Sequence, residues 1–245
     1  MLKLYGLIGY PLSHSFSKKY FTGKFEKEKI TDSEFNAFSI ENIDLLPQLI
    51  KDNPALKGLS VTIPYKESVM PFLDDLDVTA KKIGAVNCIK IANGKLIGYN
   101  TDAFGFRQSI KPFLESHHER ALILGTGGAS KAVYSVLMEI GIDCRFVTRN
   151  KKAENQFSYS ELNENMVNAF KLIVNASPVG MFPNVDNAPQ IPYEFISSSH
   201  LLYDLVYNPA QTEFLKRGKA NGAAIVNGLS MLQQQAEEAW RIWNE

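Results

Sequence analysis

The sequence predicts an α/β protein of two domains, the second built on a doubly wound parallel sheet. Three observations support this fold class. Short apolar runs that suit strands alternate with longer segments of helical periodicity along the chain. A glycine-rich turn joins a predicted strand to a predicted helix at residues 125–130. The 245 residues, 45% of them apolar, suit one large or two modest domains with substantial cores.

Composition narrows the class of protein. Lysine plus arginine and aspartate plus glutamate number 26 each, which gives no sign of a nucleic-acid partner. No apolar run reaches the roughly 18 residues of a membrane span, and residues 1–5 lack a signal-peptide layout. Cys88 and Cys144 form no Cys-x-x-Cys pair, which favours reduced core thiols over structural zinc. We expect a cytoplasmic protein that uses no metal and binds neither nucleic acid nor membrane.

The first strand is expected at residues 2–9, followed by a loop rich in hydroxyl groups and then a helix toward Ile30. Ser13, Ser15 and Ser17 are each able to cap that helix. Capping explains one serine. Three hydroxyls and His14 within five positions also suit a loop that hydrogen-bonds a polyhydroxylated or anionic small molecule, and both interpretations stay open.

A second strand is expected at residues 34–40 and a helix with an apolar face at 43–50. The next strand ends at Pro64, and Lys66 stands just past its carboxyl end. Sheets of α/β proteins tend to keep their sites at that end. Lys66 is therefore a candidate site residue, although a lysine in such a place is more often solvated.

Asn93-Gly94 between two apolar runs predicts a β-hairpin, because both turn positions tolerate positive φ. The hairpin should bring Asn87, before one arm, close to the triplet 100–102, after the other. Asp102 in that triplet is a candidate site residue. Its alternative role is the N-cap of a helix at 103–114.

The glycine-rich turn follows a buried strand at residues 121–124 and opens a helix that ends near Gly141. Gly125, Gly127 and Ser130 occupy the positions of the dinucleotide fingerprint. Small residues there let a pyrophosphate approach bare backbone, and the helix N-terminus supplies N–H groups to it. The pattern favours a dinucleotide site over an empty glycine turn.

The end of the following strand, at residues 146–148, indicates which dinucleotide binds. An NAD site usually has a carboxylate there, whereas this chain has Thr148, Arg149 and Asn150. A guanidinium pairs with a 2′-phosphate that a carboxylate would repel. The cofactor should be NADP, unless Arg149 is only a solvated surface charge.

Three further apolar runs, at 172–177, 201–206 and 224–228, extend the parallel sheet. The proline-rich stretch 178–192 is expected as a loop over the cofactor, and 211–217 begins a helix. The last helix, at 229–243, has an apolar face and carries Gln235, whose amide is able to face a cleft.

Eight motifs in order resemble those of the shikimate dehydrogenase family. They are Gly-Tyr-Pro-Leu-Ser-His-Ser-Phe-Ser at 9–17, Ser-Val-Thr-Ile-Pro-Tyr-Lys at 60–66, Gly-Ala-Val-Asn at 84–87, Gly-Tyr-Asn-Thr-Asp at 98–102, Gly-Thr-Gly-Gly-Ala at 125–129, Asn-Ala-Ser-Pro-Val-Gly-Met at 175–181, Asp-Leu-Val-Tyr-Asn-Pro at 204–209 and Gly-Leu-Ser-Met-Leu-Gln-Gln-Gln-Ala at 228–236. Two details depart from the family: Ser60 replaces its usual Asn, and 148–150 permute its Asn-Arg-Thr.

The resemblance implies NADPH-dependent reduction of 3-dehydroshikimate to shikimate, a step of chorismate and aromatic amino acid biosynthesis. It implies that Lys66 and Asp102 are the catalytic pair. It assigns substrate contacts to Ser15, Ser17, Thr62, Asn87, Tyr207 and Gln235. It assigns cofactor contacts to Gly125, Gly127, Gly128, Ala129, Thr148, Arg149, Asn150, Gly228 and Met231.

The resemblance also implies a domain organisation. Residues 1–102 form an α/β substrate domain, to which a C-terminal helix at 229–245 returns, and 103–228 form a Rossmann-type NADP domain. We expect the active site where the domains meet, in a monomer or homodimer. The rival interpretations are an NAD-using quinate/shikimate dehydrogenase and a non-catalytic nucleotide-binding paralogue, which would be expected to lose Lys66 or Asp102.

Overall fold

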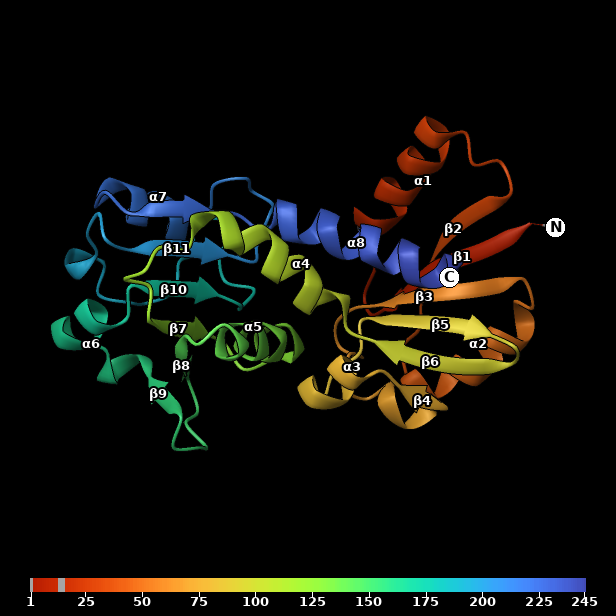
Figure 1. Ribbon diagram of the computed structural model, residues 1–245, viewed down its shortest axis with the longest axis horizontal. Helices are drawn as coiled ribbons and strands as arrows, with labels where there is room; N and C mark the ends of the chain where they lie inside the picture. Colours follow the sequence, from red (N-terminus) through yellow and green to blue (C-terminus); the bar gives the residue numbers. More distant parts are fainter. Residues whose placement is uncertain (1, 13–15) are drawn as a thin grey trace. The chain divides into compact units, whose positions relative to one another are not determined.

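A computed structural model describes residues 2–12 and 16–245 (Figure 1). The chain divides into two compact units. Unit 1 comprises residues up to Thr101 together with 236–245, and unit 2 comprises 102–235. Ser13, His14 and Ser15 lie outside the described residues.

Unit 1 holds a six-stranded mixed sheet with the order β2-β1-β3-β5-β6-β4. Strands β2, β1 and β3 are parallel, whereas β5 pairs antiparallel with both β3 and β6. Its elements are β1 (Lys3–Gly9), α1 (Phe16–Glu28), β2 (Ser33–Ser39), η1 (Ile43–Leu45), α2 (Leu46–Asp52), β3 (Leu56–Val61), η2 (Met70–Phe72), β4 (Asp75–Leu76), α3 (Val78–Ile83), β5 (Cys88–Ala92) and β6 (Lys95–Tyr99), together with the end of α8 (Leu229–Asn244).

The two faces of this sheet bury different clusters, because successive side chains of a strand point to opposite faces. In β1, Ile8 joins one cluster with residues of α2 and β3. Tyr5 and Leu7 join the other, which includes the last turns of α8. There the Trp243 ring stacks on Tyr5, with centroids 5.2 Å apart, and its indole N–H donates to the Ile89 carbonyl at 3.0 Å. The end of α8 is therefore part of the core of unit 1.

Unit 2 holds a six-stranded, all-parallel sheet with the order β12-β11-β10-β7-β8-β9. The first strand lies in the middle and the chain extends the sheet to both sides, so the sheet is doubly wound as predicted. Its elements are α4 (Thr101–Ile110), η3 (Lys111–Phe113), β7 (Arg120–Leu124), α5 (Gly128–Glu139), β8 (Asp143–Thr148), β9 (Gln156–Ser158), η4 (Tyr159–Glu161), α6 (Glu164–Ala169), β10 (Leu172–Asn175), η5 (Tyr193–Phe195), β11 (Leu201–Asp204), α7 (Glu213–Ala220), β12 (Ala224–Val226) and the start of α8. Helix α5 packs on β7 and β8, and α7 packs on β11 and β12.

Several predicted bounds differ from the structure. Helix α4 begins at Thr101, so Asp102 lies in its first turn and not at the N-cap, and η3 replaces its predicted end. The helix expected at 43–50 starts as the 3-10 turn η1 and becomes α-helical only at Leu46. Strand β9 and helix α6 were not predicted.

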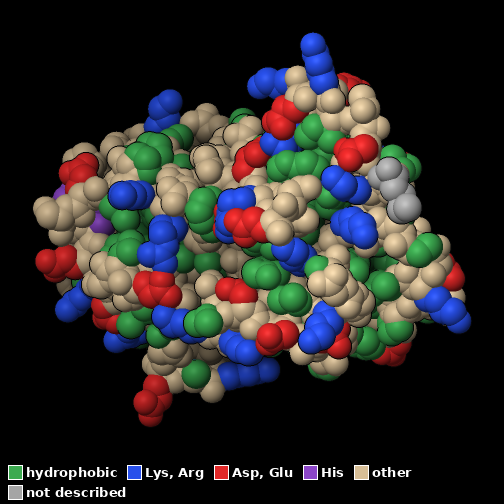
Figure 2. Space-filling model, turned by 45° about the vertical axis from the view of Figure 1, so that its right-hand side comes forward, with side chains coloured by type: hydrophobic (Ala, Val, Ile, Leu, Met, Phe, Trp, Pro, Cys, Tyr) green, Lys and Arg blue, Asp and Glu red, His purple; other side chains and the backbone are tan. Residues whose placement is uncertain are grey.

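The surface charge and the two cysteines agree with what the composition predicts. Basic and acidic side chains are interspersed on the face that Figure 2 shows. Cys88 and Cys144 are buried free thiols, and burial raises the pKa of Cys144 to about 12. Within residues 2–12 and 16–245, no helix has both the length and the apolar character that crossing a membrane requires.

Candidate active site

In unit 1, the candidate residues gather where β3 ends. Thr62 follows β3 directly, and its backbone N–H donates to the Ile8 carbonyl at 3.0 Å. The Lys66 carbonyl accepts the N–H of Val86 at 2.7 Å. Asn87 directly follows Val86, and its carbonyl accepts the Val61 N–H at the end of β3 at 2.8 Å. The structure therefore brings Lys66, Thr62 and Asn87 into one region, at the end of β3 where the sequence predicts a site.

The hairpin prediction is confirmed, together with the contact expected from it. Asn93 and Gly94 have φ values of 52° and 74° and join β5 to β6. The buried Asn87 side chain donates from Nδ2 to Thr101 Oγ1 at 3.0 Å, and its Oδ1 accepts the Thr101 N–H at 2.6 Å. Its amide is thus fixed in place by residues that directly precede Asp102.

Asp102 itself is only 6% exposed. It lies in the first turn of α4, where the positive end of the helix dipole favours a carboxylate. By its contacts Asp102 belongs to unit 2, whereas Lys66 belongs to unit 1.

In unit 2, the glycine loop has the geometry that a phosphate site requires. Gly125 has a φ of +111°, which an L side chain rarely adopts. Gly127 is the N-cap of α5, and a Cβ added there would meet nothing within 4 Å. Among the described residues, no side chain caps this helix, so a cap does not compete for its first N–H groups. Such an N-terminus is suited to an anion.

The residues after β8 lie beside this loop. Strands β7 and β8 are parallel neighbours, with Leu124 opposite Val147, and the Gly125 N–H donates to the Val147 carbonyl at 2.9 Å. Arg149, two residues after Val147, is exposed. It lies near Tyr159: burial raises the pKa of that tyrosine, and the positive charge of Arg149 partly opposes the rise. The end of β8 carries no carboxylate. These residues fit a dinucleotide that bears an extra phosphate.

The remaining predicted contacts of unit 2 lie near the carboxyl ends of β11 and β12. The Gly228 N–H donates to the Val206 carbonyl at 3.2 Å, and an added Cβ at Gly228 would collide with the Leu205 carbonyl oxygen. Met231 is buried. Gln235 is buried and donates to the Leu232 carbonyl at 2.9 Å. Burial raises the pKa of Tyr207.

Sequence reasoning missed the buried carboxylate of Asp204, at the end of β11. Burial raises its pKa to about 6, although three hydrogen bonds oppose that shift. The motif that contains Asp204 was the only available signal, and its partners become visible only in the fold.

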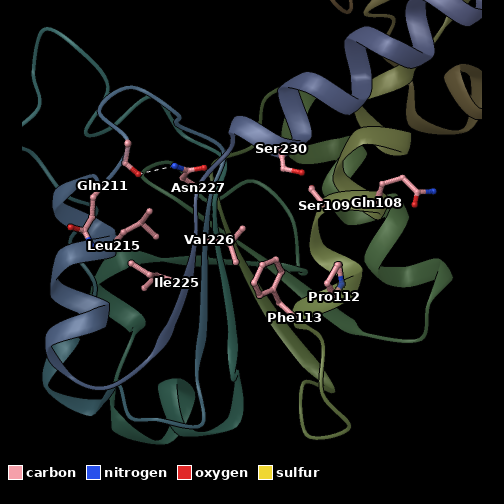
Figure 3. A pocket seen from close by; sticks show the side chains of 11 residues that line it. Gln108, Ser109, Pro112, Phe113, Gln211, Leu215, Ile225, Val226, Asn227 and Ser230 are labelled. Atoms are coloured by element: carbon pink, nitrogen blue, oxygen red, sulfur yellow. Dashed lines mark hydrogen bonds between the residues drawn. The ribbon is translucent and has the colours of Figure 1, made fainter.

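A pocket of about 470 Å³ opens beside β12 (Figure 3). It is lined by Gln108, Ser109, Pro112, Phe113, Ala210, Gln211, Leu215, Ile225, Val226, Asn227 and Ser230. Of these described residues none is charged and none is a predicted site residue. The pocket therefore lacks a counter-charge for a phosphate or carboxylate and is separate from the glycine loop.

A doubly wound sheet with an uncapped glycine-loop helix defines a class, the dinucleotide-binding α/β proteins. Comparison with known proteins narrows it. Residues 7–89 match the family model of the shikimate dehydrogenase substrate binding domain. The shikimate dehydrogenase (NADP(+)) of Methanococcus aeolicus is 40% identical over 261 residues, which cover 98% of this chain and 91% of that protein. This chain belongs to the shikimate dehydrogenase family, as its motifs predicted.

Two further relatives support the same family assignment. The shikimate dehydrogenase (NADP(+)) of Caldanaerobacter subterraneus subsp. tengcongensis is 39% identical, over 98% of this chain and 91% of that protein. The crystal structure of the Thermus thermophilus enzyme in complex with NADP(H) and shikimate superposes with a TM-score of 0.87 at 31% identity, and covers 99% of this chain and 93% of that one.

Proposed function

We propose that this protein is an NADP-dependent shikimate dehydrogenase that reversibly reduces 3-dehydroshikimate to shikimate in chorismate and aromatic amino acid biosynthesis. The observation that carries this proposal is the end-to-end similarity to relatives of that name, in a chain that has both Lys66 and Asp102. The rival interpretations, a quinate/shikimate dehydrogenase that uses NAD and a non-catalytic nucleotide-binding paralogue, have no comparable support.

Lys66 and Asp102 are proposed as the catalytic pair. NADPH, when bound, supplies the hydride. As a ketone carbon is reduced, negative charge develops on its oxygen, and the Lys66 ammonium is suited to stabilise that oxygen and donate the proton. The Asp102 carboxylate would hold the ammonium and accept a hydrogen bond from a substrate hydroxyl.

The proposed substrate contacts are hydroxyl and amide groups, which suit a ligand with several hydroxyls and one carboxylate. They are Ser15, Ser17, Thr62, Asn87, Tyr207 and Gln235. The hydrogen bonds between Asn87 and Thr101 support a role for Asn87, because a fixed amide loses little freedom when it binds a ligand.

The proposed cofactor contacts follow the geometry of unit 2. Gly125, Gly127, Gly128 and Ala129 would hold the pyrophosphate at the start of α5, and Thr148, Arg149 and Asn150 the 2′-phosphate. Gly228 and Met231 would lie beside the nicotinamide. The position of Arg149 next to the glycine loop supports NADP over NAD.

The finer organisation also remains a proposal. We assign substrate binding to residues 1–102 with the helix 229–245, and NADP binding to residues 103–228. The protein is proposed to act in the cytoplasm as a monomer or homodimer. It is proposed to have no nucleic-acid or membrane partner, which the equal counts of acidic and basic residues support.

Steady-state oxidation of shikimate and of quinate, each with NADP and with NAD, tests the function. We expect the highest kcat/KM with shikimate and NADP. A preference for quinate with NAD would support the first rival. Binding of NADP without turnover of either acid would support the second.

A further inference from the structure

The carboxylate of Asp204 joins three segments of unit 2. This residue ends β11 and is fully buried. Its Oδ1 accepts hydrogen bonds from Asn175 Nδ2 and from the Val206 N–H, both at 3.0 Å, and its Oδ2 accepts one from Thr212 Oγ1 at 2.5 Å. The partners belong to the end of β10, the loop after β11 and the N-cap of α7.

One arm of this network leads to the glycine loop. Asn175 accepts two hydrogen bonds from Ser177, from its N–H at 3.1 Å and from its hydroxyl at 2.6 Å. Ala176, between them, donates its N–H to the Leu124 carbonyl at 3.0 Å. The Ala176 carbonyl oxygen also lies 3.3 Å from where a Cβ of Gly125 would be. Asp204 thus fixes the segment that closely contacts the glycine loop.

The other arm leads to Gly228. The Val206 N–H donates to the Asp204 carboxylate, and the Val206 carbonyl accepts the Gly228 N–H at 3.2 Å. The Leu205 carbonyl lies so close to Gly228 that no Cβ fits between them. The loop after β11 therefore sets the position of Gly228, a proposed nicotinamide contact. Because β10 and β11 are adjacent strands of the sheet, the two arms of the network start side by side (Figure 1).

The chemistry of this network suits a carboxylate, which accepts all three hydrogen bonds. Two of the three partner groups, the Asn175 Nδ2 and the Val206 N–H, are only donors, and both use Oδ1. The third, Thr212, accepts the Leu215 N–H at 3.4 Å and so donates its own proton to Oδ2. An asparagine at 204 would carry no charge, and its NH₂ group would either face a donor or reverse the hydrogen bond to Thr212, whose hydroxyl would then have to accept. Burying a carboxylate is costly, and a stable fold alone is often served as well by apolar residues.

We propose that Asp204 is a positioning residue for the cofactor: its carboxylate holds the loops after β10 and β11 in the arrangement that binds the pyrophosphate and nicotinamide portions of NADP. It acts through Asn175, Ser177 and Val206 and is not itself a ligand. This inference rests on the proposed function for the identity of the cofactor.

The test compares Asp204→Asn with Tyr203→Phe in the whole 245-residue chain. Tyr203 is the preceding residue of β11, is equally buried, and is hydrogen-bonded to Ser109 at 2.6 Å, so its variant also loses a buried hydrogen bond. Its side chain points to the other face of the sheet. Unfolding midpoints, the Kd of NADP+ by calorimetry without substrate, and KM for shikimate are measured for each.

We expect Asp204→Asn to weaken NADP+ binding at least about tenfold, as loss of hydrogen bonds to a charged group does, with KM for shikimate within about twofold. Tyr203→Phe should lower the unfolding midpoint and leave the Kd of NADP+ within about twofold. If Asp204→Asn does not fold, Thr212→Val removes one donor, and a loss of about threefold in NADP+ affinity is expected.

Wild-type NADP+ affinity in a folded Asp204→Asn protein, or in Thr212→Val if only that variant folds, would overturn the inference. An equal loss of affinity in Tyr203→Phe would also overturn it. Failure of the proposed function is a separate result: the wild-type protein would then not oxidise shikimate with NADP, whatever the variants do to NADP+ binding.

Discussion

The Gly125 N–H donates to the Val147 carbonyl at 2.9 Å, which joins the glycine loop to the end of β8. Arg149 lies two residues beyond that carbonyl. One hydrogen bond between neighbouring strands therefore connects the proposed pyrophosphate site to the proposed 2′-phosphate site.

Arg149→Ala should weaken binding of NADP far more than binding of NAD. A bidentate guanidinium–phosphate pair contributes enough binding free energy that its loss should raise the Kd of NADP by about tenfold or more. Calorimetry with both dinucleotides measures this, and Lys152→Ala, an exposed cation three residues later, is the control. Equal losses for the two dinucleotides would mean that Arg149 does not contact the phosphate.

Lys66→Ala should reduce kcat for shikimate oxidation by about a hundredfold or more, the range typical of a general acid or base. The Kd of NADP should stay near the wild-type value, because Lys66 belongs to unit 1 and the glycine loop to unit 2. Lys57→Ala, an exposed residue of β3, the strand that leads to Lys66, should retain activity. An unchanged kcat in Lys66→Ala would refute the catalytic assignment.

The two loop glycines should respond differently to alanine. Gly125→Ala forces a side chain into a left-handed conformation and should cost about 1–2 kcal/mol of stability. Gly127→Ala has extended backbone and open space around the new methyl group, so the fold should keep its stability while NADP binding weakens. Chemical unfolding and calorimetry on both variants separate the effects. A Gly127→Ala protein with normal affinity would show that no phosphate approaches there.

Acid should destabilise unit 2 through two buried histidines. Burial lowers the pKa of His118 and of His200 below the usual 6.5. Their Nδ1 atoms accept backbone N–H groups, those of Glu115 at 2.9 Å and Ser197 at 3.0 Å, so both rings fold in the neutral form. The unfolded chain then binds more protons, and stability that is complete above about pH 6.5 declines as the pH falls toward the lowered values.

Urea unfolding at several pH values from 7.5 downward checks this, with a slope of up to about 1.4 kcal/mol per pH unit for each histidine. His200→Asn keeps an acceptor near the Ser197 N–H and does not titrate, so its slope should be smaller. A slope equal to that of the wild-type protein would exclude His200 as a source of the acid sensitivity.

The parts of the fold that were predictable are those set by local sequence. The Asn93-Gly94 turn and the glycine loop need only a few neighbouring residues to specify them. Strand β9 has three partly buried residues and α6 only six residues, too few for a periodic signal. The start of α4 was misplaced because Thr101 is held by Asn87, fourteen residues earlier in the chain.

The candidate site also has a part that local sequence predicts and a part that it does not. Arg149 and the glycines were identifiable because each motif has a fixed spacing from the strand before it. The hydrogen-bond network of Asp204 was not, since its partners Asn175 and Thr212 lie 29 and 8 residues away and meet it only in the folded chain.

Trp243 and its neighbours in α8 complete a core whose other side chains are encoded before residue 101. A ribosome synthesises the whole of unit 2 before it makes this segment. During synthesis, the aromatic face around Tyr5 and Phe21 therefore stays without its cover until residues 236–245 have left the ribosome, and unit 1 is the first to be started and the last to be finished.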